Sequence, residues 1–89
     1  MAFRKLTFVG IDSSGEYPKP MPWHPQRTDD YAADCQLGRS YFQELFEFMQ
    51  KEANTAFLSR VLSAQVAGGR WDAVEIGFSQ AMSEKLLVA

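Results

Sequence analysis

The chain has 89 residues, enough for one small domain. With 46% hydrophobic and 22% charged residues, its composition is that of a globular protein and excludes a disordered chain. The net charge is −2 and the basic residues are scattered, so no stretch could neutralise several phosphates, and we do not expect nucleic acid as a partner.

The cysteine content and the distribution of apolar residues bear on the compartment. A single cysteine excludes an intramolecular disulfide and is typical of a reducing environment. The first residues lack the apolar segment of a secretory signal, and no run of about eighteen apolar residues could cross a bilayer. We therefore expect a cytoplasmic protein with no membrane partner.

The N-terminal residues favour β-structure. Residues 3–11 are rich in strand-forming types and alternate in a way that predicts a strand with both faces partly buried. A turn signal follows at residues 12–15, after which Glu16 and Tyr17 could return as a second strand. Residues 1–17 are thus expected to form either a single strand or a hairpin.

Prolines dominate the next segment, residues 18–27. At this density proline favours an extended backbone close to polyproline II, which predicts a stiff arm. Met21 and Trp23 give the arm apolar side chains that can lie on a surface. The loose PxxP pattern within the arm is compatible with a partner domain, but we favour packing on the protein's own helices. The four prolines are Pro18, Pro20, Pro22 and Pro25.

The remaining residues, 28–89, predict three helices. Asp30 is a suitable N-cap for the first helix, and two consecutive glycines stop the second. Asp72 and Glu75 form a capping-box-like pair at the start of the third. Gln65 is a polar residue on the inward face of the second helix. The predicted helices cover residues 30–53, 55–66 and 73–87.

The expected fold is mainly α. It is a three-helix bundle-like domain preceded by a short N-terminal β-strand or hairpin and a proline-rich extended arm. Residues 1–89 are expected to form a single domain, because the chain is too short for two cores.

The first predicted helix carries two apolar lines instead of one. Gly38 lies on the main line and costs up to about 1 kcal/mol in a helix, which indicates close approach of another backbone or a kink. Two lines indicate that the helix is covered from two directions. The main line is Tyr31, Cys35, Gly38, Phe42, Leu45, Phe46, Met49 and Ala53, and the second is Leu37, Tyr41 and Phe48.

The second line, together with Trp23, is the candidate binding surface. Tyrosine, phenylalanine and tryptophan are residue types that anchor protein interfaces. We hypothesise that Leu37, Tyr41, Phe48 and Trp23 contact a second copy or another protein. The alternative is that the chain's own N-terminal third covers this line.

A pocket between the proline-rich arm and the first helix is a second hypothesis, and it implies a small-molecule-binding or enzymatic domain. Its polar members would be His24, Asp34 and Arg39, with Trp23 and Tyr41 as walls. This hypothesis predicts that these side chains converge on one cavity.

We predict no catalytic residue, no metal ligand and no cofactor. His24 has no orienting partner at a diagnostic spacing, and Cys35 is expected in the core. One histidine and one cysteine do not supply the four ligands of structural zinc. The sequence therefore predicts a non-enzymatic protein that acts through protein contacts, as a homodimer or an accessory subunit. A nucleic-acid-linked regulator would require a basic patch around Arg60 and Arg70.

Overall fold

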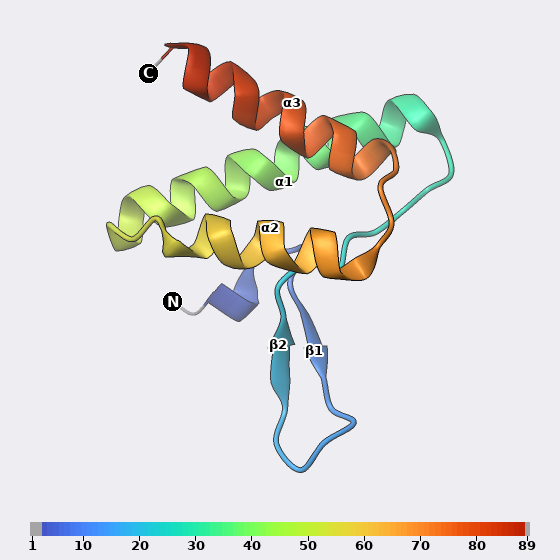
Figure 1. Ribbon diagram of the computed structural model, residues 1–89, viewed down its shortest axis with the longest axis vertical. Coiled ribbons are helices and arrows are strands. Elements are labelled where there is room, and N and C mark those ends of the chain that lie inside the picture. Colours follow the sequence, from blue (N-terminus) through green and yellow to red (C-terminus); the bar gives the residue numbers. More distant parts are fainter. Residues whose placement is uncertain (1–2, 89) are drawn as a thin grey trace.

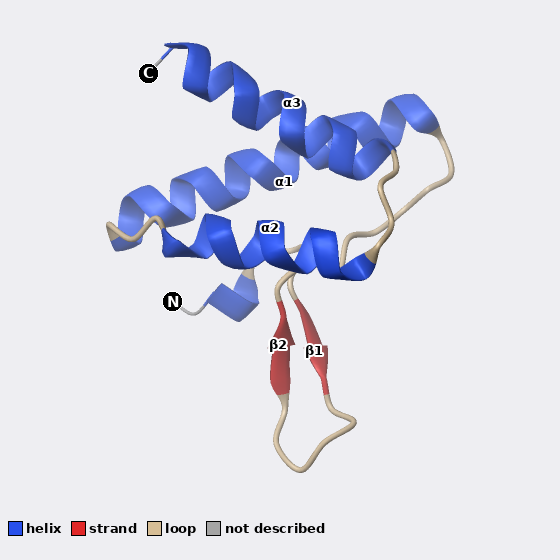
Figure 2. Ribbon diagram, viewed as in Figure 1, coloured by secondary structure: helices blue, strands red, loops and turns tan. Residues whose placement is uncertain are grey.

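The computed structural model describes residues 3–88 and is mainly helical (Figures 1 and 2). The predicted mainly α fold with an N-terminal hairpin is confirmed, and each helix ends within two residues of its predicted bounds. The elements are a 3-10 helix, Phe3–Lys5, strands β1 (Gly10–Asp12) and β2 (Lys19–Met21), and helices α1 (Tyr31–Glu52), α2 (Ala56–Gly68) and α3 (Ala73–Val88).

The predicted position of the β-structure is wrong. Residues 3–5 form a helical turn, and β1 begins only at Gly10. The return strand does not start at Glu16 but lies inside the proline segment, where β2 pairs antiparallel with β1. The early turn puts Phe3, Leu6 and Phe8 in the core, which a straight strand would not do. The register pairs Gly10 with Met21, Ile11 with Pro20 and Asp12 with Lys19.

The helix ends follow the capping signals in the sequence. The Asp30 side chain accepts a hydrogen bond of 3.2 Å from the Ala33 amide at the start of α1. α2 is capped at its C-terminus by Gly69, whose φ of 68° is the left-handed conformation that glycine adopts without strain. At the start of α3, the Asp72 amide donates to the Glu75 carboxylate over 2.8 Å, so the capping pair is confirmed.

Helix α3 crosses α1 where each helix presents a glycine (Figure 1). A Cβ on Gly38 would lie 1.9 Å from the Val74 carbonyl oxygen. A Cβ on Gly77 would lie 1.9 Å from the Cys35 carbonyl oxygen. The close approach predicted from Gly38 is therefore confirmed, and α3 contributes a second glycine to it.

The chain's own N-terminal segment covers the second apolar line of α1. Tyr41 is 4% exposed and its ring centroid lies 5.5 Å from that of Phe8 and 5.9 Å from that of Trp23. Phe48 is 5% exposed and packs on the rings of Phe3 and Phe57. These aromatic contacts make the second line part of one hydrophobic core.

The hairpin stands out from the helical body (Figure 1), and residues 11–19 are exposed. Its base is held by the His24 amide, which donates to the Phe8 carbonyl over 2.7 Å. Within residues 3–88, no helix combines the length and the apolar character that crossing a membrane requires.

Candidate functional site

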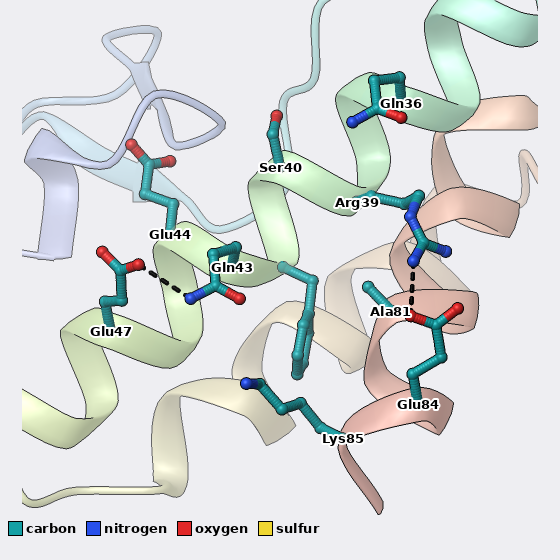
Figure 3. Close-up of a pocket in the computed structure, with 10 residues that line it drawn as sticks. Gln36, Arg39, Ser40, Gln43, Glu44, Glu47, Ala81, Glu84 and Lys85 are labelled. Carbon is teal, nitrogen blue, oxygen red and sulfur yellow. Dashed lines mark hydrogen bonds and ion pairs between the residues drawn. The ribbon is translucent and has the colours of Figure 1, made fainter.

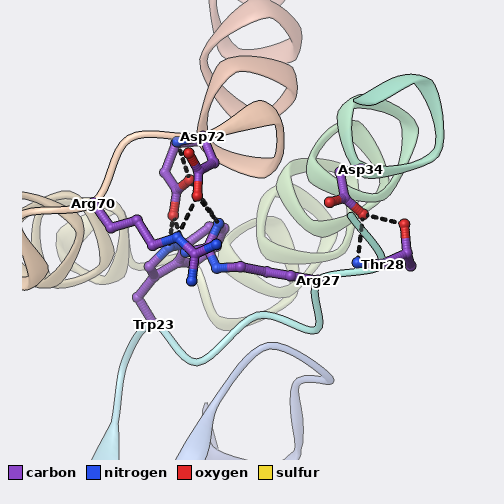
Figure 4. A network of polar contacts seen from close by, with 7 residues as sticks. Trp23, Arg27, Thr28, Asp34, Arg70 and Asp72 are labelled. Atoms are coloured by element: carbon purple, nitrogen blue, oxygen red, sulfur yellow. Dashed lines mark hydrogen bonds and ion pairs between the residues drawn. The ribbon is translucent and has the colours of Figure 1, made fainter. Parts of the chain in front are cut away.

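A buried carboxylate organises the junction between the arm and α3 (Figure 4). The Glu75 side chain is fully buried and receives two hydrogen bonds from the Arg27 guanidinium, of 3.0 and 2.6 Å. The indole N–H of Trp23 donates to the same carboxylate over 2.8 Å, and the Asp72 amide does so over 2.8 Å. The two parallel bonds from Arg27 to Glu75 are a bidentate contact, which is the strong form of a charge-assisted hydrogen bond. It ties the arm to the first turn of α3.

The hydrogen bonds determine the ionisation of Glu75. Burial raises its pKa, but the bonds from Arg27 and Trp23 and the Asp72 amide outweigh burial, so the pKa falls from 4.5 to about 2. The bond to Glu75 raises the pKa of Arg27 in return. The carboxylate is therefore ionised at neutral pH and does not supply a proton there.

A pocket of about 460 Å³ lies beside this cluster. Trp23, His24 and Arg27 line it from the arm, Gln65 from α2, and Arg70 from the turn between α2 and α3. The size is within the usual range for small-molecule sites, roughly 300–1,000 Å³.

Gln65 distinguishes this pocket. Its side chain is 2% exposed, and within residues 3–88 neither Oε1 nor Nε2 has a hydrogen-bond partner. Leaving such a group unpaired costs about 1–3 kcal/mol. Buried polar groups are usually satisfied, so a buried amide left unpaired beside a pocket indicates a place for a ligand atom.

A second pocket of about 660 Å³ lies between α1 and α3 (Figure 3). The Arg39 guanidinium donates to Glu84 over 2.5 Å, and the Gln43 amide donates to Glu47 over 2.8 Å. The Lys85 ammonium lies 4.6 Å from the centroid of the Phe46 ring. Because these polar groups are already engaged with one another, this groove is the weaker candidate.

The structure does not bring together the predicted pocket residues. His24 lines the pocket beside Glu75, with an exposed side chain whose ring lies against Gly10. Arg39 faces α3 and lines the other pocket. Asp34 is buried and accepts hydrogen bonds from the Thr28 hydroxyl and amide, at 2.7 and 2.9 Å, which lower its pKa. The three residues therefore do not form the cavity expected between the arm and the first helix.

The predicted interface residues do not form an exposed surface either. Tyr41 and Phe48 are buried in the core, and Leu37 and Trp23 are half-buried against it. The physical reason is that the N-terminal segment and the arm supply the aromatic side chains that cover this line.

The two arginines of the proposed basic patch are also engaged. The Arg60 guanidinium lies 5.0 Å from the centroid of the Phe3 ring, and Arg70 pairs with Asp72. In the described part of the chain, no three side chains among histidine, cysteine, aspartate and glutamate are placed to hold a metal ion.

Sequence reasoning missed the Arg27–Glu75 pair. The two residues are 48 positions apart, and the sequence marks Glu75 only as a capping residue. Gln65 could be noticed in the sequence, because it is a polar residue on the inward face of a predicted helix.

Comparison with known proteins gives no assignment: no family model matches the chain, and we find no significantly similar curated protein or solved structure.

Proposed function

We propose that the chain is a non-enzymatic protein-interaction module whose projecting hairpin pairs with the hairpin of a second copy. One observation carries this proposal: β1 has an open outer edge, whereas the outer edge of β2 is blocked by proline. The described sheet contains these two strands.

The exposed side chains of the hairpin support the proposal. Ile11 is 46% exposed, Tyr17 71% and Met21 36%, and they lie on an element that extends away from the helices (Figure 1). A two-stranded hairpin is at best marginally stable by itself in water. A further paired strand would stabilise it and cover Ile11.

The prolines distinguish the two edges of the sheet. Pro20 has no N–H and pairs with Ile11 in the register, so its nitrogen fits only where β2 faces away from β1. Pro18 and Pro22 flank this three-residue strand directly on either side. The outer edge of β2 therefore lacks donors. By the same geometry, the N–H and C=O of Ile11 point outward from β1.

Two copies can pair through β1 in a favourable register. An antiparallel pair centred on Ile11 places the two isoleucines opposite each other, and Gly10 opposite Asp12 of the second copy. Apolar cross-strand pairs are stabilising, and the two aspartates do not face each other. The resulting four-stranded sheet has proline at both outer edges. Pairing therefore ends at a two-fold symmetric dimer instead of continuing into a fibre.

Hydrogen exchange at the Ile11 amide tests this pairing. If β1 pairs with a second copy, the amide is protected and its protection increases with protein concentration. The Gly15 amide, in the exposed turn, is the reference for free exchange. Exchange of Ile11 at the rate of Gly15 at every concentration would contradict the proposal.

A further inference from the structure

We infer that the pocket beside the Arg27–Glu75 pair binds a small neutral molecule with a ring amide, and that Gln65 recognises its N–H and C=O. This site is separate from the hairpin and does not depend on dimer formation. It is built by the arm, α2 and the turn that leads into α3.

Gln65 is the group in this pocket that is free to bind. The residue is 2% exposed and its buried amide is unpaired, and the described residues contain no other buried side-chain nitrogen or oxygen without a partner. The side chains of His24 and Gln26, which also line the pocket, are exposed to solvent, and the charged groups and the Trp23 indole have partners. Glu75 holds Arg27 and Trp23, and Arg70 pairs with Asp72. A ligand therefore does not have to break an ion pair in order to bind Gln65.

The charges around the pocket favour a neutral ligand. Arg27 lies 2.6 Å from the Glu75 carboxylate and 3.8 Å from that of Asp72, and Arg70 is paired with Asp72 as well. Two guanidinium groups thus face two carboxylates. An added anion would lie close to a carboxylate, and an added cation would lie close to a guanidinium. Either ion would therefore be repelled by a like charge at short range, whereas a neutral molecule would not.

The chemistry of a carboxamide specifies the ligand further. Gln65 presents an acceptor oxygen and a donor nitrogen side by side. Its complement is a donor and an acceptor on the same edge of the ligand. An ordinary peptide bond is trans, so its N–H and C=O point in opposite directions and cannot both reach Gln65. A ring amide is held in the cis form and presents both groups on one edge, as lactams, cyclic imides and pyrimidine bases do.

The experiment follows the side-chain amide signals of Gln65 by NMR on the full chain, with the signals assigned from their loss in Gln65→Leu. The probes are 2-pyrrolidinone, a simple lactam, and uracil, a pyrimidine base. 1,3-Dimethyluracil serves as a probe without a donor. We expect the Gln65 signals to shift and saturate with at least one of the first two probes. Binding of the dimethyl compound should be weaker by at least about tenfold.

Two variants and a comparison of the two probes complete the test. Gln65→Leu should abolish probe binding, while Gln80→Leu, which removes an exposed amide from α3, should leave it unchanged. Without any probe, Gln65→Leu should raise Tm, because it removes an unpaired buried amide. Tighter binding of uracil than of the lactam would indicate a base-like ligand, and the reverse would indicate a non-aromatic ring amide.

Several outcomes would overturn the inference. It fails if neither probe shifts the Gln65 signals at millimolar concentration, or if 1,3-dimethyluracil binds as tightly as uracil. It also fails if Gln65→Leu lowers Tm, because the amide would then be satisfied within the protein. The wild-type titration stands even if the variant does not fold, because the Gln65 amide signals can also be assigned by through-bond correlation spectra of the isotope-labelled wild type.

Discussion

Gly38 of α1 and Gly77 of α3 both lie in the contact between these two helices, and each is closed in by the backbone of the opposite helix. On either residue, a Cβ would lie 1.9 Å from a carbonyl oxygen across the contact. This close approach brings Phe42 against Phe78, whose ring centroids are 5.4 Å apart. It also fixes the first turn of α3, from which Glu75 reaches the arm.

Gly38→Ala and Gly77→Ala should each destabilise the protein by about 1–3 kcal/mol or more, because the added methyl group forces the helices apart. This loss should exceed the gain in helix propensity, which is up to about 1 kcal/mol. Urea denaturation followed by circular dichroism measures the change. Gly68→Ala is the matched control, because no atom lies within 4 Å of its Cβ position. A neutral Gly38→Ala would contradict the close approach.

Glu75→Gln should destabilise the protein by roughly 3–5 kcal/mol, because it leaves the Arg27 guanidinium without its buried partner. Glu84→Gln is the comparison, since it removes the exposed ion pair with Arg39 and should cost about 0–1 kcal/mol. The free energy of unfolding is measured for both variants in urea. Equal losses for the two would contradict the structural role of the Glu75 cluster.

The stability should depend on pH through Glu75. Its pKa is about 2 in the folded protein and lies below the ordinary value of 4.5. The stabilisation is therefore fully present above the ordinary pKa and is lost as the pH falls from there toward the folded pKa. The midpoint of urea unfolding should fall more steeply in the wild type than in Glu75→Gln over this acidic window. Parallel curves would show that Glu75 does not titrate with unfolding.

Tyr41→Glu and Phe48→Glu should unfold the protein rather than separate two subunits, because each places a carboxylate among buried aromatic side chains. Tyr31→Glu is the control, since Tyr31 is 65% exposed at the start of α1, where a negative charge is favourable. Helical content by circular dichroism separates the outcomes. A folded Tyr41→Glu variant with a lower mass in solution would mean that the second apolar line is an interface after all.

The helices could be predicted because their signals are local. The apolar spacing of α1, the Asp30 cap and the left-handed Gly69 are all visible in the sequence, and they bring the predicted ends within two residues of those observed. Gly38 was informative for the same reason, since a glycine on an apolar line implies a close neighbour.

The N-terminal third could not be predicted to the same degree. A short segment such as residues 3–8, in which Phe3, Leu6 and Phe8 stand among polar residues, does not distinguish a strand from a helical turn, and its burial depends on helix α1. The prolines argued against a strand at residues 19–21, but their alternation lets them occupy a sheet edge. The Arg27–Glu75 pair depends on the way the arm folds back onto α3, which no local pattern encodes.

Molar mass in solution tests the central claim most directly. Size-exclusion chromatography with light scattering should give twice the chain mass of 10.1 kDa for the wild type and for Ile11→Val, which keeps the amide and the β-branched side chain. Ile11→Pro should give the mass of one chain with unchanged helical content. It removes the outward N–H of β1 but no hydrogen bond within the hairpin. A wild type that has the mass of one chain at every concentration would contradict the account.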